Sequence, residues 1–162
     1  MTGKIKILIV DDEVQFLESI ARRLELRDFE VTKAASGAQA VRAARERKFD
    51  LALLDLKMPG MDGIQVLEML KQEHKYLEVI ILTGHGSVDS AVECTKLGAF
   101  GYLPKPYELE KLLDTLKDAY QARMVKKFQD DQERAGKIAD LATGSSALAI
   151  LRELRKLDDE EK

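Results

Sequence analysis

Short apolar runs alternate with amphipathic stretches through the first two thirds of the chain. Five runs rich in β-branched or large apolar residues fall at residues 5–10, 30–33, 51–54, 79–82 and 100–103. Stretches of helical length separate them at residues 14–26, 36–47, 63–74 and 87–97, and another helical pattern begins at residue 107. Apolar residues recur there every three or four positions, which indicates helices with one buried face. Apolar runs set between helices are typical of buried parallel strands.

This order predicts an α/β protein of the (βα)5 type, with helices on both faces of one parallel sheet. A doubly wound, flavodoxin-like sheet with strand order 2-1-3-4-5 is the expected arrangement. Local signals agree with the helix ends: Ser36 and Asp62 stand where amino-terminal caps are expected, and Gly98 where a left-handed cap is expected. Ligands of such sheets bind beyond the carboxyl ends of the strands, so the residues that follow each strand are candidate site residues.

Residues 1–121 are predicted to form this domain, and residues 122–162 a helical tail or linker without a recognisable output domain. An apolar series could extend the last helix of the domain and favour a homodimer or an attached partner: Leu116, Tyr120, Met124 and Phe128. A charged, partly ordered linker is an equal alternative, because residues 129–137 are rich in charge. Leucines at every third position over residues 147–157 indicate a packing face in either case.

Composition narrows the functional classes. The chain has 162 residues, of which 45% are hydrophobic and 34% charged, and a net charge of −3. This length suits one domain with an appendage, and the charge gives no reason to expect direct nucleic-acid binding. Cys94 is the only cysteine, so no internal disulfide is possible. No apolar run approaches the ~20 residues of a membrane span, and a cytoplasmic location without membrane contact is therefore expected.

Carboxylates follow two strands that the predicted order makes neighbours. Asp11 and Asp12 follow the first strand, and Asp55 follows the third. Each alone would pass for a helix-start or turn residue, but like charges brought this close need a cation or a proton between them. Oxygen ligands of this kind suit Mg²⁺, which keeps several waters. We expect Asp12 and Asp55 to bind the metal directly and Asp11 to bind it through water.

Two further polar residues end the remaining strands. Thr83 follows the fourth strand, where its hydroxyl could donate to a phosphoryl oxygen and Gly84 would let the backbone approach closely. Lys105 follows the fifth strand between two prolines, Pro104 and Pro106, and its ammonium could reach an anion at this edge. The Lys105–Pro106 bond is a candidate cis peptide. A threonine that merely ends a strand and a solvated loop lysine are the alternatives.

Four motifs in this order resemble the receiver domain of two-component response regulators, over about residues 4–120. They are Val10-Asp11-Asp12-Glu13, Leu54-Asp55-Leu56-Lys57-Met58-Pro59-Gly60-Met61-Asp62-Gly63, Leu82-Thr83-Gly84 and Lys105-Pro106. The fold that this resemblance implies is like that of chemotaxis regulators. The stretch from Thr83 to Ala99 is most similar to receivers of the nitrogen-regulation type.

The resemblance implies a phosphorylation-dependent switch, not an enzyme. Asp55 would accept a phosphoryl group from a sensor histidine kinase or a phosphotransfer protein, and Thr83 and Lys105 would contact that group. Asp11, Asp12, Asp55 and the backbone carbonyl of Lys57 would hold Mg²⁺. Thr83 and Tyr102 would act as the switch pair that changes the face of the fourth helix, fifth strand and fifth helix, which could also form a homodimer. The chain would be a stand-alone receiver or the receiver part of a longer regulator.

Pro104 departs from the pattern of that family, because it removes a backbone donor directly before Lys105. Two other functions are weighed. A Mg²⁺-dependent phosphohydrolase working through an aspartyl phosphate would usually carry a second acid two residues after the nucleophile, but position 57 is Lys. A flavodoxin-like cofactor binder would need a phosphate-cradling loop after the first strand, where this chain has Asp11, Asp12 and Glu13.

Overall fold

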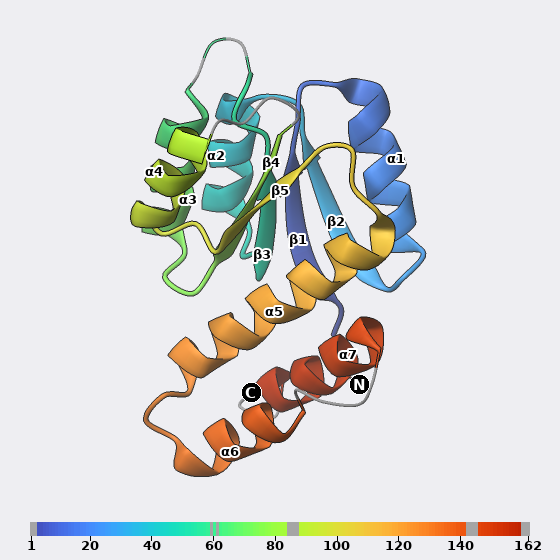
Figure 1. The fold of residues 1–162 in the computed structure, drawn as a ribbon, viewed down its shortest axis with the longest axis vertical. Coiled ribbons are helices and arrows are strands. Elements are labelled where there is room, and N and C mark those ends of the chain that lie inside the picture. The colour runs from blue at the N-terminus through green and yellow to red at the C-terminus, as the bar shows by residue number, and fades with distance from the viewer. Residues whose placement is uncertain (1–2, 59, 61, 84–87, 142–145, 160–162) are drawn as a thin grey trace.

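The computed structural model describes residues 3–58, 60, 62–83, 88–141 and 146–159, with the side chains of residues 83 and 88–91 outside the description. Five parallel strands form one sheet in the order β2-β1-β3-β4-β5. Helices cover both faces of this sheet (Figure 1). The predicted (βα)5 architecture and strand order are therefore confirmed.

The elements lie close to their predicted positions. The strands are β1 (Ile5–Val10), β2 (Phe29–Ala34), β3 (Leu51–Leu54), β4 (Glu78–Thr83) and β5 (Gly101–Pro104). The helices of the sheet domain are α1 (Val14–Glu25), α2 (Gly37–Glu46), α3 (Gly63–Glu73), α4 (Val88–Lys96) and α5 (Leu109–Lys127). Two further helices follow, α6 (Gln132–Asp140) and α7 (Ala147–Asp159).

Two apolar cores sit on opposite faces of the sheet. Ile7 and Ile9 of β1 pack in the core that α1 and α5 cover. Leu8 and Val10, the residues between and after them, pack in the core of α2, α3 and α4. Successive side chains of a strand point to opposite faces, so an unbroken apolar run buries both sides. These cores fix the strands whose carboxyl ends carry the candidate site.

The expected local signals are present. Ser36 Oγ accepts from the Gln39 amide at 3.2 Å, and Asp62 Oδ1 accepts from the Ile64 amide at 3.1 Å. Gly98 ends its turn at φ +103°, a left-handed conformation that favours glycine. The Lys105–Pro106 bond is cis. Pro104 is the last residue of the edge strand β5, where a missing N–H is tolerated.

The tail folds back on its own domain. Helix α5 continues to Lys127, so of the two alternatives for this stretch the structure has the extended helix, and α7 then lies along α5 (Figure 1). The apolar series on α5 is buried in the same core as Leu151 and Leu154 of α7: Leu116, Tyr120, Met124 and Phe128. This apolar face of α5 is covered within one chain.

A buried polar network also joins the tail to the sheet. Asp158 of α7 accepts from Tyr120 Oη at 2.6 Å, from Arg123 at 3.0 Å and from Lys127 at 2.6 Å. Arg155 of α7 donates to Asp50, directly before β3, at 3.1 Å. Asp158 and Arg155 are 2% and 6% exposed, so these charges are satisfied inside the protein rather than by water.

The two described ends of the chain meet at α7. The Gly3 amide donates to Asp159 Oδ2 at 2.8 Å, so the first and last described residues are in contact. No helix in the described ranges combines the length and the apolar character needed to cross a membrane.

Candidate functional site

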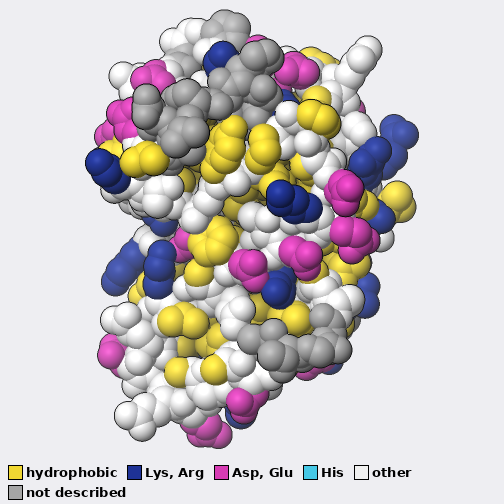
Figure 2. All heavy atoms as spheres, in the orientation of Figure 1, with side chains coloured by type: hydrophobic (Ala, Val, Ile, Leu, Met, Phe, Trp, Pro, Cys, Tyr) yellow, Lys and Arg dark blue, Asp and Glu magenta, His cyan; other side chains and the backbone are white. Residues whose placement is uncertain are grey.

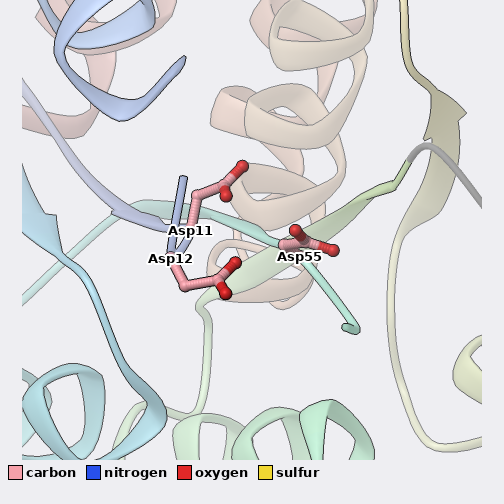
Figure 3. Close-up of side chains that lie close together, drawn as sticks. All are labelled: Asp11, Asp12 and Asp55. Carbon is pink, nitrogen blue, oxygen red and sulfur yellow. The ribbon is translucent and has the colours of Figure 1, made fainter. Parts of the chain in front are cut away.

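Three carboxylates meet at the carboxyl ends of β1 and β3, which are neighbouring interior strands. Asp11 and Asp12 follow β1, Asp55 follows β3, and one ligand oxygen from each lies within 4.8 Å of the others. Figure 3 shows the three side chains gathered at this edge. The Asp55 amide donates to the Val10 carbonyl at 3.0 Å, so the strand pairing continues into the site and sets the spacing.

Backbone amides fix two of these carboxylates. Asp11 Oδ1 accepts from the Glu13 amide at 2.9 Å, and Asp55 Oδ1 accepts from the Lys57 amide at 3.0 Å. Asp11 and Asp55 are only 2% and 5% exposed. Asp12 makes no hydrogen bond or ion pair with the described part of the chain, so its oxygens remain available to a ligand.

Lys105 reaches the same site from the loop after β5. Its ammonium lies 2.5 Å from Asp11 Oδ2 and 3.6 Å from Asp55 Oδ2. Glu13 Oε1 stands 3.9 Å away, and the centre of the Phe16 ring also lies 3.9 Å from the ammonium. Lys105 therefore lies beside the carboxylates, at the edge of the sheet where we expected it. Its side chain is 13% exposed, so these interactions are only weakly screened by water.

The electrostatics of the site favour a cation. Burial raises the pKa of the Asp55 carboxyl above its ordinary value, and the charges of Asp11 and Asp12 raise it further. The Lys57 amide and Lys105 act in the opposite direction but do not cancel this effect. Three carboxylates and one ammonium leave an excess of negative charge, which a divalent cation would neutralise.

The donor set fits Mg²⁺. All three ligand residues offer carboxylate oxygens, and a site with few protein ligands suits an ion that keeps several waters. The backbone carbonyl of Lys57 as a further ligand stays a prediction. The metal would withdraw charge from oxygens of a bound phosphoryl group.

The switch residues are placed only in part. Thr83 ends β4 beside Pro104 of β5, and its side chain lies outside the described residues. Tyr102 lies on β5 opposite Ile81 and is partly buried against the core of α2, α3 and α4. The coupled movement that we expect of the switch pair Thr83 and Tyr102 stays a prediction.

Two aromatic residues beside Lys105 were not foreseen as site residues. Phe16 lies on the first turn of α1 and meets the Tyr107 ring edge to face, with the ring centres 6.1 Å apart. Phe16 is partly buried and packs against the core that α1 and α5 cover. Its place on the first turn of the helix that follows Asp11 and Asp12 in the sequence was the available signal.

Comparison with known proteins identifies the sheet domain. Residues 7–117 match the family described as the response regulator receiver domain. The transcriptional regulatory protein ZraR of Klebsiella oxytoca is 40% identical over 120 residues, which are 74% of this chain and 27% of that protein. Other relatives are named NtrC or NtrX-like, in agreement with the predicted nitrogen-regulation type. The chain thus spans about a quarter of the length of these curated relatives.

Solved structures of response regulators are similar to this chain. A CheY-like receiver domain protein of Methanospirillum hungatei JF-1 has a TM-score of 0.74 at 31% identity, covering 76% of this chain and 99% of that one. A response regulator of Burkholderia pseudomallei, solved with a phosphorylated aspartic acid, a calcium ion and citrate, has a TM-score of 0.69 at 25% identity. That match covers 96% of this chain and 97% of the other, so it extends into the tail. The chain belongs to the response regulator receiver domain family of two-component signalling proteins.

Proposed function

We propose that this protein is a phosphorylation-dependent signalling switch whose acceptor is Asp55. The phosphoryl donor is a phosphohistidine on a sensor kinase or a phosphotransfer protein of the cytoplasm. The observation that supports this proposal is the convergence of Asp11, Asp12 and Asp55 within 4.8 Å, with the Lys105 ammonium among them. The protein acts as a phosphoacceptor and assists its own phosphorylation, rather than turning over a separate substrate.

In the proposed reaction an Asp55 oxygen attacks phosphorus, a new O–P bond forms, and the P–N bond to the donor histidine breaks. The histidine leaves with the electron pair of that bond and takes up a proton. Lys105 already lies 3.6 Å from Asp55, so its ammonium can meet a phosphoryl oxygen with little movement. Catalysis here is positioning and charge neutralisation, since the groups are in place before the donor arrives.

The proposed output passes through the face of α4, β5 and α5. A phosphoryl group at Asp55 favours the state in which Thr83 turns inward and Tyr102 follows, because only contacts that differ between two states can shift their populations. Dimerisation through this face remains part of the proposal. Dimerisation through the apolar series of α5 is not proposed, because α7 of the same chain covers it.

Intact-mass measurement after incubation with Mg²⁺ and acetyl phosphate tests the proposed function. We expect one added phosphoryl group for each chain, and a much slower reaction when EDTA removes the metal. Absence of any adduct with both acetyl phosphate and a phosphorylated histidine donor would refute the proposal.

Mg²⁺ should stabilise the folded protein. A ligand that binds only the folded state raises the free energy of unfolding by RT ln(1 + [L]/Kd), which is about 2.7 kcal/mol at a hundredfold excess over Kd. We expect a higher thermal midpoint with Mg²⁺, and a much smaller rise for Asp12→Asn. Asp28→Asn is the control, because Asp28 is an exposed carboxylate outside the site. Equal rises in all three proteins would contradict the proposed metal site.

The Phe16 ring should speed phosphorylation by holding Lys105 in place. A cation over an aromatic face gains about 0.5–2 kcal/mol, so Phe16→Leu should slow phosphorylation by acetyl phosphate about 3–10-fold. Phe16→Trp should keep most of the rate, because it keeps a ring. Phe100→Leu is the matched control, since Phe100 packs partly buried against the same core but has no described contact with Lys105. Equal rates for Phe16→Leu and Phe100→Leu would show that the ring contact is irrelevant.

A phosphohydrolase is not favoured. Lys57 occupies the position where such an enzyme would usually place its second acid, and it lies exposed beside Asp55. Lys105, the basic group that the described residues place beside Asp55, is held by carboxylates and cannot replace that acid.

A further inference from the structure

A pocket of about 410 Å³ lies at the other end of the sheet, where the tail meets the amino ends of the strands. We call it the amino-edge pocket. Its walls come from the start of β1, the loops before β3 and β4, and helices α5 and α7. This volume falls within the range of roughly 300–1,000 Å³ that is usual for small-molecule sites. Asp55 does not line it, so the pocket is separate from the proposed phosphoryl site.

Lysines and arginines outnumber carboxylates in the lining of the pocket, although the net charge of the whole chain is −3. Three carboxylates line the pocket, namely Asp50, Glu73 and Asp158. The cationic residues that line it are Lys6, Lys48, Lys75, Lys127, Arg123 and Arg155. An acidic protein that collects cations at one concave site concentrates anions there.

The carboxylates of the lining are already occupied. Asp50 pairs with Arg123 and Arg155, each at 3.1 Å, and Asp158 pairs with Lys127 at 2.6 Å. Glu73 accepts from Arg45 at 3.2 Å, away from the pocket lining. None of the three is therefore left to neutralise the remaining lysines of the pocket.

Three lysines of the pocket, from three separate segments, have no acidic partner in the described chain. Lys6 and Lys48 make no hydrogen bond or ion pair through their side chains, and Lys75 lies 5.2 Å over the Tyr76 ring. We call Lys6, Lys48 and Lys75 the rim lysines. Figure 2 shows Lys and Arg side chains gathered at the left of the waist between the sheet and the tail.

We propose that the amino-edge pocket binds a small phosphate-bearing anion. An ammonium is a compact charge that suits a phosphate oxygen, and three lysines from different segments that line one pocket match a group with several such oxygens. A concave pocket, rather than an open groove, favours a small molecule over an acidic protein segment. Because Arg155 and Asp158 of α7 line the pocket, the bound anion also stabilises the docked tail.

Calorimetric titration with pyrophosphate, in EDTA and at low salt, tests the proposal on the full chain. Without a metal the Asp55 site carries excess negative charge and does not attract this probe. We expect saturable binding of one pyrophosphate for each chain, with backbone amide shifts at residues 48–50 and 74–77. Salt should weaken the binding, because part of the attraction is screened. Amide hydrogen exchange in α7 should slow when pyrophosphate is bound.

The rim lysines give the decisive variants. Lys48→Ala with Lys75→Ala should weaken pyrophosphate binding about tenfold, because two of the three unpaired charges at the pocket are lost and each exposed charge contributes only modestly. Lys96→Ala with Lys111→Ala is the matched control, since both lysines are exposed, unpaired in the described chain and outside the pocket. Absence of saturable binding, equal loss in both double variants, or tighter binding of a polyglutamate peptide than of pyrophosphate would overturn the proposal. Phosphorylation of Asp55 is measured separately and can succeed or fail independently.

Discussion

Asp55→Asn should yield a protein that takes up no phosphoryl group from acetyl phosphate or from a histidine donor. The amide has the size of the carboxylate but lacks the anionic oxygen that must attack phosphorus. Loss should be complete rather than partial, because no other described carboxylate has Asp55's position, buried beside Lys105 at the end of β3. Intact-mass analysis measures the result directly. An adduct that persists in Asp55→Asn would show that the acceptor lies elsewhere.

The loss should occur without unfolding. Burial raises the pKa of Asp55 in the folded state, so the ionised carboxylate costs stability once pH rises through that folded value. Replacing it by an uncharged amide removes this cost, and the thermal midpoint at neutral pH should be equal to or above that of the unmodified protein. Asp114→Asn is the matched control, because Asp114 is exposed on α5, and it should leave both phosphorylation and the midpoint unchanged.

Asp158→Ala should lower the free energy of unfolding by about 3–5 kcal/mol, the usual cost of removing one partner of a buried ion pair. Asp158 is 2% exposed and accepts from Tyr120, Arg123 and Lys127. Its removal takes a buried acceptor from one phenol and from three cations, namely Tyr120, Arg123, Lys127 and Arg155. Urea unfolding measures the loss, and amide exchange should show that α7 opens first. Glu153→Ala on the same helix should cost at most about 1 kcal/mol, since Glu153 forms an exposed pair.

Acid should weaken the same network. Burial by itself would raise the pKa of Asp158, but Arg123, Lys127 and Tyr120 together hold it below its ordinary value. The stability that Asp158 provides is therefore complete above the ordinary Asp pKa of 3.8 and is lost as pH falls toward the lower folded value. A tail that keeps its α7 protection in Asp158→Ala would show that apolar packing alone holds the tail.

The sheet domain could be predicted because its signals are local. Each strand is an apolar run of a few residues and each helix has its own period, as the residues of β1 and α1 illustrate. The site was predictable for a related reason, since Asp11, Asp12, Asp55 and Lys105 all follow strands. A parallel sheet brings the carboxyl ends of its strands together, so their proximity follows from the strand order.

The sequence indicated the apolar face of the extended α5, but not the segment that covers it. The helical period of residues 116–128 indicated an extension of α5, but the same pattern serves a dimer or a covering helix equally well. Which partner covers an apolar face depends on contacts between distant residues, and periodicity carries no information about them. Tyr120 shows this, since its spacing suggested packing alone whereas its hydroxyl donates to Asp158.

The sequence by itself therefore determined the (βα)5 sheet, the carboxylates and the lysine at its carboxyl edge, and the apolar series on residues 116–128. These features depend on residue spacing and on the geometry of one sheet. Only the tertiary structure decided that α7 returns to cover α5, that Asp50 and Asp158 bind Arg123 and Arg155, and that Phe16 lies against Lys105. Most of these pairs are far apart in the sequence, and only Arg155 and Asp158 lie one helical turn apart. Their charges interact strongly because they are buried.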